Sequence, residues 1–148
     1  MVDKRKRDPK DEEDQELRER NQWLTKVSNY GMTLQTAPEK FKGCREIVLA
    51  AVENTGKALS FASDLMKDDE QIVRAAIRSD PKSLTLASER LRNDKALALL
   101  ALKRCSTVYC TLSETLKSDP DVEAAYNKRF NFENPSTAPS PASSQKKK

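Results

Sequence analysis

The chain has 148 residues, of which 36% are hydrophobic, 34% charged and 5% aromatic, so it is long enough for one domain with tails whose core is built mainly from Leu, Ala, Ile and Val. It contains no histidine, three glycines and three cysteines, which excludes most catalytic triads. The formal net charge is only +4, and no segment carries the large field of one sign that is typical of an obvious nucleic-acid binder.

The first segment, residues 1–20, is charged and is expected to be partly disordered, with a helix from about Asp11 onward supported by pairs of opposite charge. Its cations are a candidate contact to polyanions or a nuclear-import signal, or they are simply a solvated end that the acids at 11–14 neutralise. These cations are Lys4, Arg5, Lys6 and Arg7. No apolar stretch follows them, which is unlike a secretory signal peptide. We therefore expect an intracellular protein, cytoplasmic or nuclear.

From residue 19 onward the sequence repeats with a period of 25 residues, which is typical of repeat architectures. The repetition predicts a helical repeat domain over residues 21–130, with a degenerate unit 19–43, three full units 44–68, 69–93 and 94–118, and a cap 119–130. Residues that recur at equivalent apolar positions are expected to form the core. They are Ile47, Val52, Leu59, Ala62, Met66, Ile72, Ile77, Leu84, Ala87, Leu91, Leu97, Leu102, Tyr109 and Leu116.

Each unit is expected to hold two short helices of about ten residues, which are marginal alone and stable only when stacked. Residues Ile47, Val48, Ala51 and Val52 follow helical spacing in the first, and the second steps by three and four. The fold class predicted is all-α, with short helical-hairpin repeats stacked as a small α-solenoid or compact helical array.

Two kinds of residue mark the ends of the predicted helices: aspartates that cap helix N-termini, and helix-breaking residues between the two helices of a unit. Asp69, Asp94 and Asp119 each precede the first apolar position of a unit, where an aspartate caps a helix N-terminus. The slot between the two helices holds Gly31, Gly56, Pro81 and Ser106. A glycine in that slot is expected to close the first helix in a left-handed conformation, whereas a proline opens the second helix.

The last segment, residues 131–148, is rich in Pro and Ser and ends in three lysines. This composition predicts a disordered tail. The longest apolar run, 96–102, is far shorter than the roughly 20 residues of a membrane-spanning helix, so no membrane association is expected.

The unit 44–68 resembles the repeat called domain of unknown function 4116. It has the hydrophobic, alanine-rich first helix, an Asn-x-Gly turn at 54–56, Ala-Leu-x-Phe-Ala-Ser over 58–63 and a leucine before the next aspartate. The second unit replaces the glycine by Pro81, and the third has Ser106 there and Tyr109 in place of leucine. The resemblance implies an all-helical repeat and carries no activity, cofactor or catalytic residue.

Candidate chemistry elsewhere is sparse. Cys105 and Cys110 lie five residues apart, but a metal site would need Cys44 or carboxylates as further ligands, so we predict small hydrophobic cysteines and no metal. Phe61 and Tyr109 lie in or beside core positions, which favours packing over base stacking. Serines and lysines occur without a positioned base or a glycine-rich cradle. No catalytic residue, cofactor or small-molecule substrate is predicted.

These observations predict a protein that binds another protein, as an adaptor or accessory subunit, through repeat positions that differ from unit to unit. The varying positions are Glu53, Arg78 and Lys103; Lys57, Lys82 and Thr107; and Ser60, Thr85 and Cys110. An ordinary solvated face is the alternative interpretation. The alternative function is a nucleic-acid-associated protein that uses the basic termini, 4–7 and 146–148. An enzyme, the third possibility, would need a partner that carries the cofactor.

Overall fold

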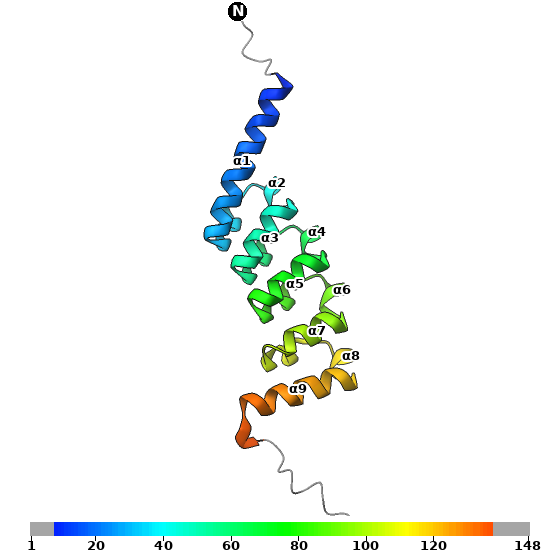
Figure 1. The fold of residues 1–148 in the computed structure, drawn as a ribbon. Coiled ribbons are helices and arrows are strands. Elements are labelled where there is room, and N and C mark those ends of the chain that lie inside the picture. Colours follow the sequence, from blue (N-terminus) through cyan, green and yellow to red (C-terminus); the bar gives the residue numbers. More distant parts are fainter. Residues whose placement is uncertain (1–7, 138–148) are drawn as a thin grey trace, which may run out of the picture.

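A computed structural model describes residues 8–137, and within this range every regular element is a helix. Successive units follow one another along the molecule, so that α1 and α9 lie at its two ends (Figure 1). The α-helices are α1 (Pro9–Asn29), α2 (Glu39–Lys42), α3 (Arg45–Asn54), α4 (Asp64–Lys67), α5 (Glu70–Ser79), α6 (Glu89–Arg92), α7 (Lys95–Leu102), α8 (Glu114–Lys117) and α9 (Pro120–Glu133). The 3-10 helices are η1 (Gly31–Thr36), η2 (Gly56–Phe61), η3 (Pro81–Leu86), η4 (Ser106–Thr111) and η5 (Pro135–Thr137). The predicted all-α class is confirmed.

Each full unit contains three helices rather than the expected two. A longer α-helix is followed by a six-residue 3-10 helix and then by a four-residue α-helix, as in α3, η2 and α4. The expected second helix is broken at Ala62 and Ser63, which have extended φ/ψ angles of −71°/156° and −64°/160°. The prediction of two ten-residue helices was therefore wrong for the second helix.

The break is stabilised by hydrogen bonds between units. The N–H of Ser63 donates to the carbonyl of Lys42 in the preceding unit at 3.0 Å, and the N–H of Ser88 donates to the carbonyl of Lys67 at 3.0 Å. A continuous helix would use these N–H groups internally. Because buried backbone groups need partners, the extended residues exchange a bond within a helix for one between units.

The core runs along the stack of long helices. The first apolar position of each unit is fully buried in Ile47, Ile72, Leu97 and Val122. The long helices contact one another in chain order, α1 with α3, α3 with α5, α5 with α7 and α7 with α9. One continuous core therefore joins all the units.

The glycine slot is explained by close packing and not by a left-handed backbone. No glycine has a positive φ among the residues that the structure describes, so that expectation was wrong. Gly31 and Gly56 instead begin η1 and η2, where a Cβ would lie 2.4 Å from the carbonyl oxygen of Ala51 and 2.6 Å from that of Ala76, respectively. Glycine is needed because the next long helix approaches the backbone directly.

In the two units where glycine holds this slot, its N–H group donates a hydrogen bond to the next unit. Gly31 donates to Oδ1 of Asn54 at 2.8 Å, and Gly56 donates to Oγ of Ser79 at 3.0 Å. Pro81 has no N–H group, and the corresponding residue of the next unit is Arg104, which offers no acceptor. The helix α7 ends at Leu102, two residues before that position. The backbone donor and its acceptor are thus lost together.

The aspartate N-caps are confirmed. Asp69 accepts hydrogen bonds from the N–H groups of Gln71 and Ile72, Asp94 from that of Leu97, and Asp119 from that of Asp121. Two of these caps also bind the preceding unit, because Arg45 Nε lies 3.0 Å from Asp69 and Lys95 Nζ lies 2.9 Å from Asp119. Cys44 holds the same position before α3 and makes no capping bond.

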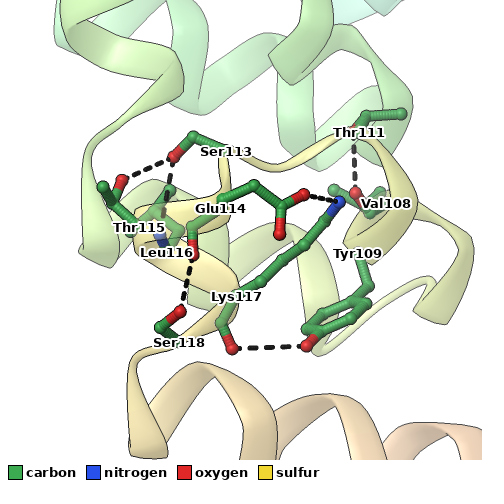
Figure 2. A network of polar contacts seen from close by, with 9 residues as sticks. All are labelled: Val108, Tyr109, Thr111, Ser113, Glu114, Thr115, Leu116, Lys117 and Ser118. Carbon is green, nitrogen blue, oxygen red and sulfur yellow. Dashed lines mark hydrogen bonds and ion pairs between the residues drawn. The ribbon is translucent and has the colours of Figure 1, made fainter.

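The unit 94–118 shows how a unit is closed internally (Figure 2). The hydroxyl of Tyr109 in η4 donates to the carbonyl of Lys117 in α8 at 3.3 Å, and Oγ of Ser113 accepts from the N–H of Leu116 at 3.5 Å. The ring of Tyr109 also stacks on that of Tyr126 in α9, with centroids 4.1 Å apart. These contacts join the 3-10 helix to the short α-helix and to the cap.

The ends differ from the expected boundaries. Helix α1 begins at Pro9, and the acidic residues Asp11 and Glu12 in its first turn favour a helix N-terminus there. The helix then continues without a break through residue 20, the expected boundary. Helix α9 continues to Glu133, three residues beyond the expected cap. The predicted tail over residues 131–148 lies outside the described residues from 138 onward, and both basic clusters, 4–7 and 146–148, lie wholly outside them.

Candidate functional site

The fourteen predicted core residues lie inside the stack. Twelve are buried, and Met66 and Tyr109 are partly buried and pack against the core. Phe61 and Cys105 are also partly buried against it. These side chains fill space between units, so the surface and not the core holds the candidate site.

The nine positions that vary between units are all exposed, and they separate into two groups. Glu53, Arg78 and Lys103 lie at the C-terminal ends of α3, α5 and α7. The other six positions lie on the 3-10 helices. Sequence reasoning placed all nine on one face, whereas the structure divides them by element.

Four of the six positions on the 3-10 helices meet in one hollow of about 330 Å³. We call this the 3-10 hollow. Its lining comes from three consecutive 3-10 helices and the residue before η3: Met32, Lys57, Ser60, Asp80, Lys82, Ser83, Thr85 and Leu86. The repeat therefore brings equivalent positions of neighbouring units to a shared surface.

The polar groups of the 3-10 hollow leave two cations available. Ser60 Oγ donates to the carbonyl of Lys57 at 2.9 Å, and Thr85 Oγ1 donates to that of Lys82 at 2.9 Å. These hydroxyls are satisfied within their own helices. Neither Lys57 nor Lys82 forms an ion pair with any residue in the range 8–137. Together with partly buried Met32 and Leu86, the hollow offers two ammonium groups beside apolar surface.

The shifted pKa values belong to contacts that hold the fold together. A hydrogen bond from Lys95 lowers the pKa of Asp119, and one from the hydroxyl of Ser106 lowers the pKa of Glu133. Partial burial raises the pKa of Asp69, but hydrogen bonds from Arg45 and from backbone N–H groups outweigh it and lower that pKa overall. These carboxylates are anchored between or within units, and none lines the 3-10 hollow.

The cysteines do not come together. Cys44 precedes α3, Cys105 precedes η4 and Cys110 lies within η4, and Cys105 Sγ contacts Thr107 Oγ1 at 2.9 Å. Within residues 8–137, no cluster of three or more acidic or cysteine side chains is arranged to hold a metal ion. In the same residues, no helix combines the length and the apolar character that crossing a membrane requires.

One surface residue was missed by sequence reasoning. Phe132 was assigned to the disordered tail, but it lies on α9 and is 76% exposed. It faces a second hollow together with Lys103 and Ala125. The spacing of seven residues between Ala125 and Phe132, two helical turns, was the signal that α9 continued.

Comparison with known proteins agrees with the repeat seen in the fold. Domain of unknown function 4116 (DUF4116) matches in two adjacent copies, over residues 20–67 and 69–117. Each copy spans two of the 25-residue units, and the first copy includes the weaker unit. Comparisons with curated proteins and with solved structures found no match. The chain belongs to the DUF4116 family, as a tandem pair of its all-helical domains.

Proposed function

We propose that this protein is a non-catalytic interaction module, an adaptor or accessory subunit, that binds a protein partner through the 3-10 hollow. The single observation that carries the proposal is the gathering of Lys57, Ser60, Lys82 and Thr85 in one hollow. These positions are alike in the two units that meet here but change to Thr107 and Cys110 in the unit 94–118, while the buried positions stay apolar. Stacked repeats commonly use such variable outward positions for recognition.

The chemistry of the hollow suits a protein surface. Met32 and Leu86 supply apolar area, and the two lysines supply positive charge at its edge. Protein interfaces combine an apolar centre with a polar rim in this way. Because both ammonium groups lack an ion-pair partner among the described residues, a partner with acidic groups at the rim would gain electrostatic complementarity.

The non-catalytic part of the proposal is supported by how the reactive side chains are used. In the 3-10 hollow the hydroxyls of Ser60 and Thr85 donate to their own helix. Asp80, the one carboxylate there, accepts the backbone N–H of Lys82 at 3.0 Å. A nucleophile needs a base within hydrogen-bonding reach. The contacts above give Ser60, Thr85 and Asp80 structural roles, and the buried Oγ of Ser83, which also lines the hollow, has no hydrogen-bond partner within residues 8–137 that could act as a base.

Capture of partners by the full chain tests the proposal. Proximity labelling with the wild type is compared with Lys57→Glu/Lys82→Glu, and we expect that variant to recover the partner at least about tenfold less, as for loss of two rim charges in a small interface. Lys10→Glu/Arg92→Glu is the matched control, because it changes the net charge equally at exposed residues that line neither this hollow nor the one at Phe132, and it is expected to retain the partner. Circular dichroism confirms that both variants are folded.

Three results would contradict the proposal. One is equal recovery of every partner by the wild type and Lys57→Glu/Lys82→Glu. The second is steeply salt-dependent binding of DNA or RNA that disappears when residues 1–7 and 138–148 are removed, which would favour the nucleic-acid function. The third is turnover of a co-purifying small molecule, which would favour an enzyme.

A further inference from the structure

A second hollow lies between the end of α7 and the C-terminal half of α9. It has a volume of about 420 Å³ and is lined by Lys103, Ala125, Lys128, Arg129 and Phe132. We call it the α7–α9 hollow. It shares no residue with the 3-10 hollow, so an inference drawn from it does not depend on the function proposed above.

The α7–α9 hollow has an exposed aromatic wall. Phe132 is 76% exposed although it is a large aromatic residue. Ala125, which is partly buried, lies on the same helix and also lines the hollow. The guanidinium of Arg129 lies 5.2 Å from the centre of the Phe132 ring. A ring held in this way offers apolar area for another large side chain, as interface anchors require.

The charges at the rim are positive and mostly unused. Arg129 is paired with Glu133 at 2.8 Å, and Glu133 also accepts a hydrogen bond from Ser106. Lys103 and Lys128 form no ion pair with any residue between 8 and 137. The hollow therefore presents two unpaired cations beside an apolar floor.

These cations continue a column that the repeat creates. Arg78, Lys103 and Lys128 occupy the same position in three consecutive units, and Arg78 is likewise exposed and without an ion pair in the described part of the chain. Packed helices lie about 8–10 Å apart, so the column spans about 16–20 Å. An extended chain of about six residues covers that length.

We propose that the α7–α9 hollow and this column bind an acidic peptide segment of a partner protein that carries one large apolar side chain. The apolar side chain packs against Phe132 and Ala125, and carboxylates along the peptide pair with Lys128, Lys103 and Arg78. Charge complementarity selects this occupant, because the rim is positive over three units. A hollow lined by one aromatic ring suits a single apolar anchor better than it suits a series of stacked bases.

The test uses the full chain and a fluorescein-labelled peptide of alternating glutamate and serine that ends in phenylalanine, eight residues long, followed by fluorescence anisotropy. We expect Lys103→Glu/Lys128→Glu to weaken binding at least about tenfold. Phe132→Ala, at an exposed site, is expected to weaken it at least about fivefold. Lys10→Glu/Arg92→Glu, at exposed residues that line neither hollow, is the matched control and is expected to bind the peptide like the wild type.

Several outcomes would overturn the inference. These are no binding of the peptide by the wild type up to about 1 mM, equal binding by Lys103→Glu/Lys128→Glu, and equal binding of a peptide whose phenylalanine is replaced by alanine. Stronger competition by oligo-dT than by unlabelled peptide would assign the surface to nucleic acid. Sedimentation of the wild type as an assembly that Lys103→Glu/Lys128→Glu dissociates would assign it to a second copy of the chain. A loss of binding in Lys57→Glu/Lys82→Glu but not in Lys103→Glu/Lys128→Glu would move the site to the 3-10 hollow.

Discussion

Gly56 lies where two neighbouring units come closest. A Cβ at this position would lie 2.6 Å from the carbonyl oxygen of Ala76 and 2.5 Å from Oγ of Ser83. Real carbon and oxygen atoms do not approach so closely, and the first of these neighbours is backbone. A side chain at residue 56 would therefore force the two units apart.

We predict that Gly56→Ala lowers the free energy of unfolding by about 1–3 kcal/mol, as overpacking does in cores. Gly43→Ala is the matched control, because the nearest atom to its Cβ would be Ser63 Oγ at 3.8 Å and its φ is −96°. That substitution is expected to be neutral or to stabilise by about 0.4–1 kcal/mol. Urea denaturation followed by circular dichroism measures both, and equal effects would refute the close approach.

Cys44 is the odd member of the N-cap positions. Arg20 lies 25 residues before Arg45, whose Nε binds the cap Asp69 at 3.0 Å. Nε of Arg20 is buried without a hydrogen-bond partner within residues 8–137. The first unit therefore keeps the cation of the repeated pair but lacks its aspartate.

We expect Cys44→Asp to raise the free energy of unfolding by about 0.5–1 kcal/mol, because it adds an N-cap to α3 and a partner for Nε of Arg20, whose Nη1 already lies 3.4 Å from Glu46. Cys44→Ser adds a cap without the charge and is expected to fall between the variant and the wild type. Thermal unfolding at neutral pH measures the order. If Cys44→Asp were no more stable than Cys44→Ala, an aspartate at residue 44 would not pair with Arg20 in the way that Asp69 pairs with Arg45.

At the scale of the element, the aspartate caps make stability depend on pH. The pKa of Asp69 is lowered in the folded protein by the hydrogen bonds that outweigh its partial burial. A group whose folded pKa lies below its unfolded value of about 3.9 contributes stability above that value and loses it as the pH falls through the folded pKa. The contribution of Asp69 is thus complete near neutrality and lost in acid.

We predict that the wild type loses stability steeply below about pH 4 and that Asp69→Asn loses less over the same range. Asparagine can still cap α5, but it does not titrate and forms no charged pair with Arg45. Thermal melts between about pH 7 and pH 2.5 compare the two slopes. Parallel slopes would mean that the carboxylate of Asp69 is not held as the structure shows.

The elements that sequence reasoning predicted well are those set by local chemistry. The first helix of each full unit and the caps Asp69, Asp94 and Asp119 follow from helical spacing and from aspartates that accept backbone N–H groups. The prediction of a continuous second helix was wrong because its break depends on a hydrogen bond from the N–H of Ser63 to the carbonyl of Lys42, a residue of another unit. Ser63, Ser88 and Ser113 at the same position were a signal for a new N-terminus.

The candidate site was predictable in composition and not in arrangement. Lys57, Ser60, Lys82 and Thr85 were identified as outward residues, but their meeting in one hollow follows from the 3-10 helices lying side by side. Phe132 was assigned to the tail because the boundary was set by composition alone, and the Pro- and Ser-rich composition of the following residues was taken to begin at residue 131. Composition describes a segment, whereas burial of one face decides where a helix such as α9 ends.

At the scale of the whole molecule, the stack explains how a chain with 5% aromatic residues forms a continuous core. Each short helix is marginal alone, and each unit is held by its neighbours through apolar packing, a glycine contact and backbone hydrogen bonds. Stability in such stacks arises largely between neighbours. Because successive units are stacked in the same orientation, side chains at equivalent positions form lines along the molecule. These lines create both the 3-10 hollow and the basic column that includes Lys103.

The central claim is that neighbouring units are joined by backbone hydrogen bonds where the second helix is broken at Ser63 and at Ser88. The most direct measurement is NMR scalar coupling across hydrogen bonds in the folded full chain. The structure predicts couplings from the amide nitrogen of Ser63 to the carbonyl carbon of Lys42, and from that of Ser88 to Lys67. Couplings from Ser63 to Leu59 and from Ser88 to Leu84, as a continuous second helix would give, would contradict the account.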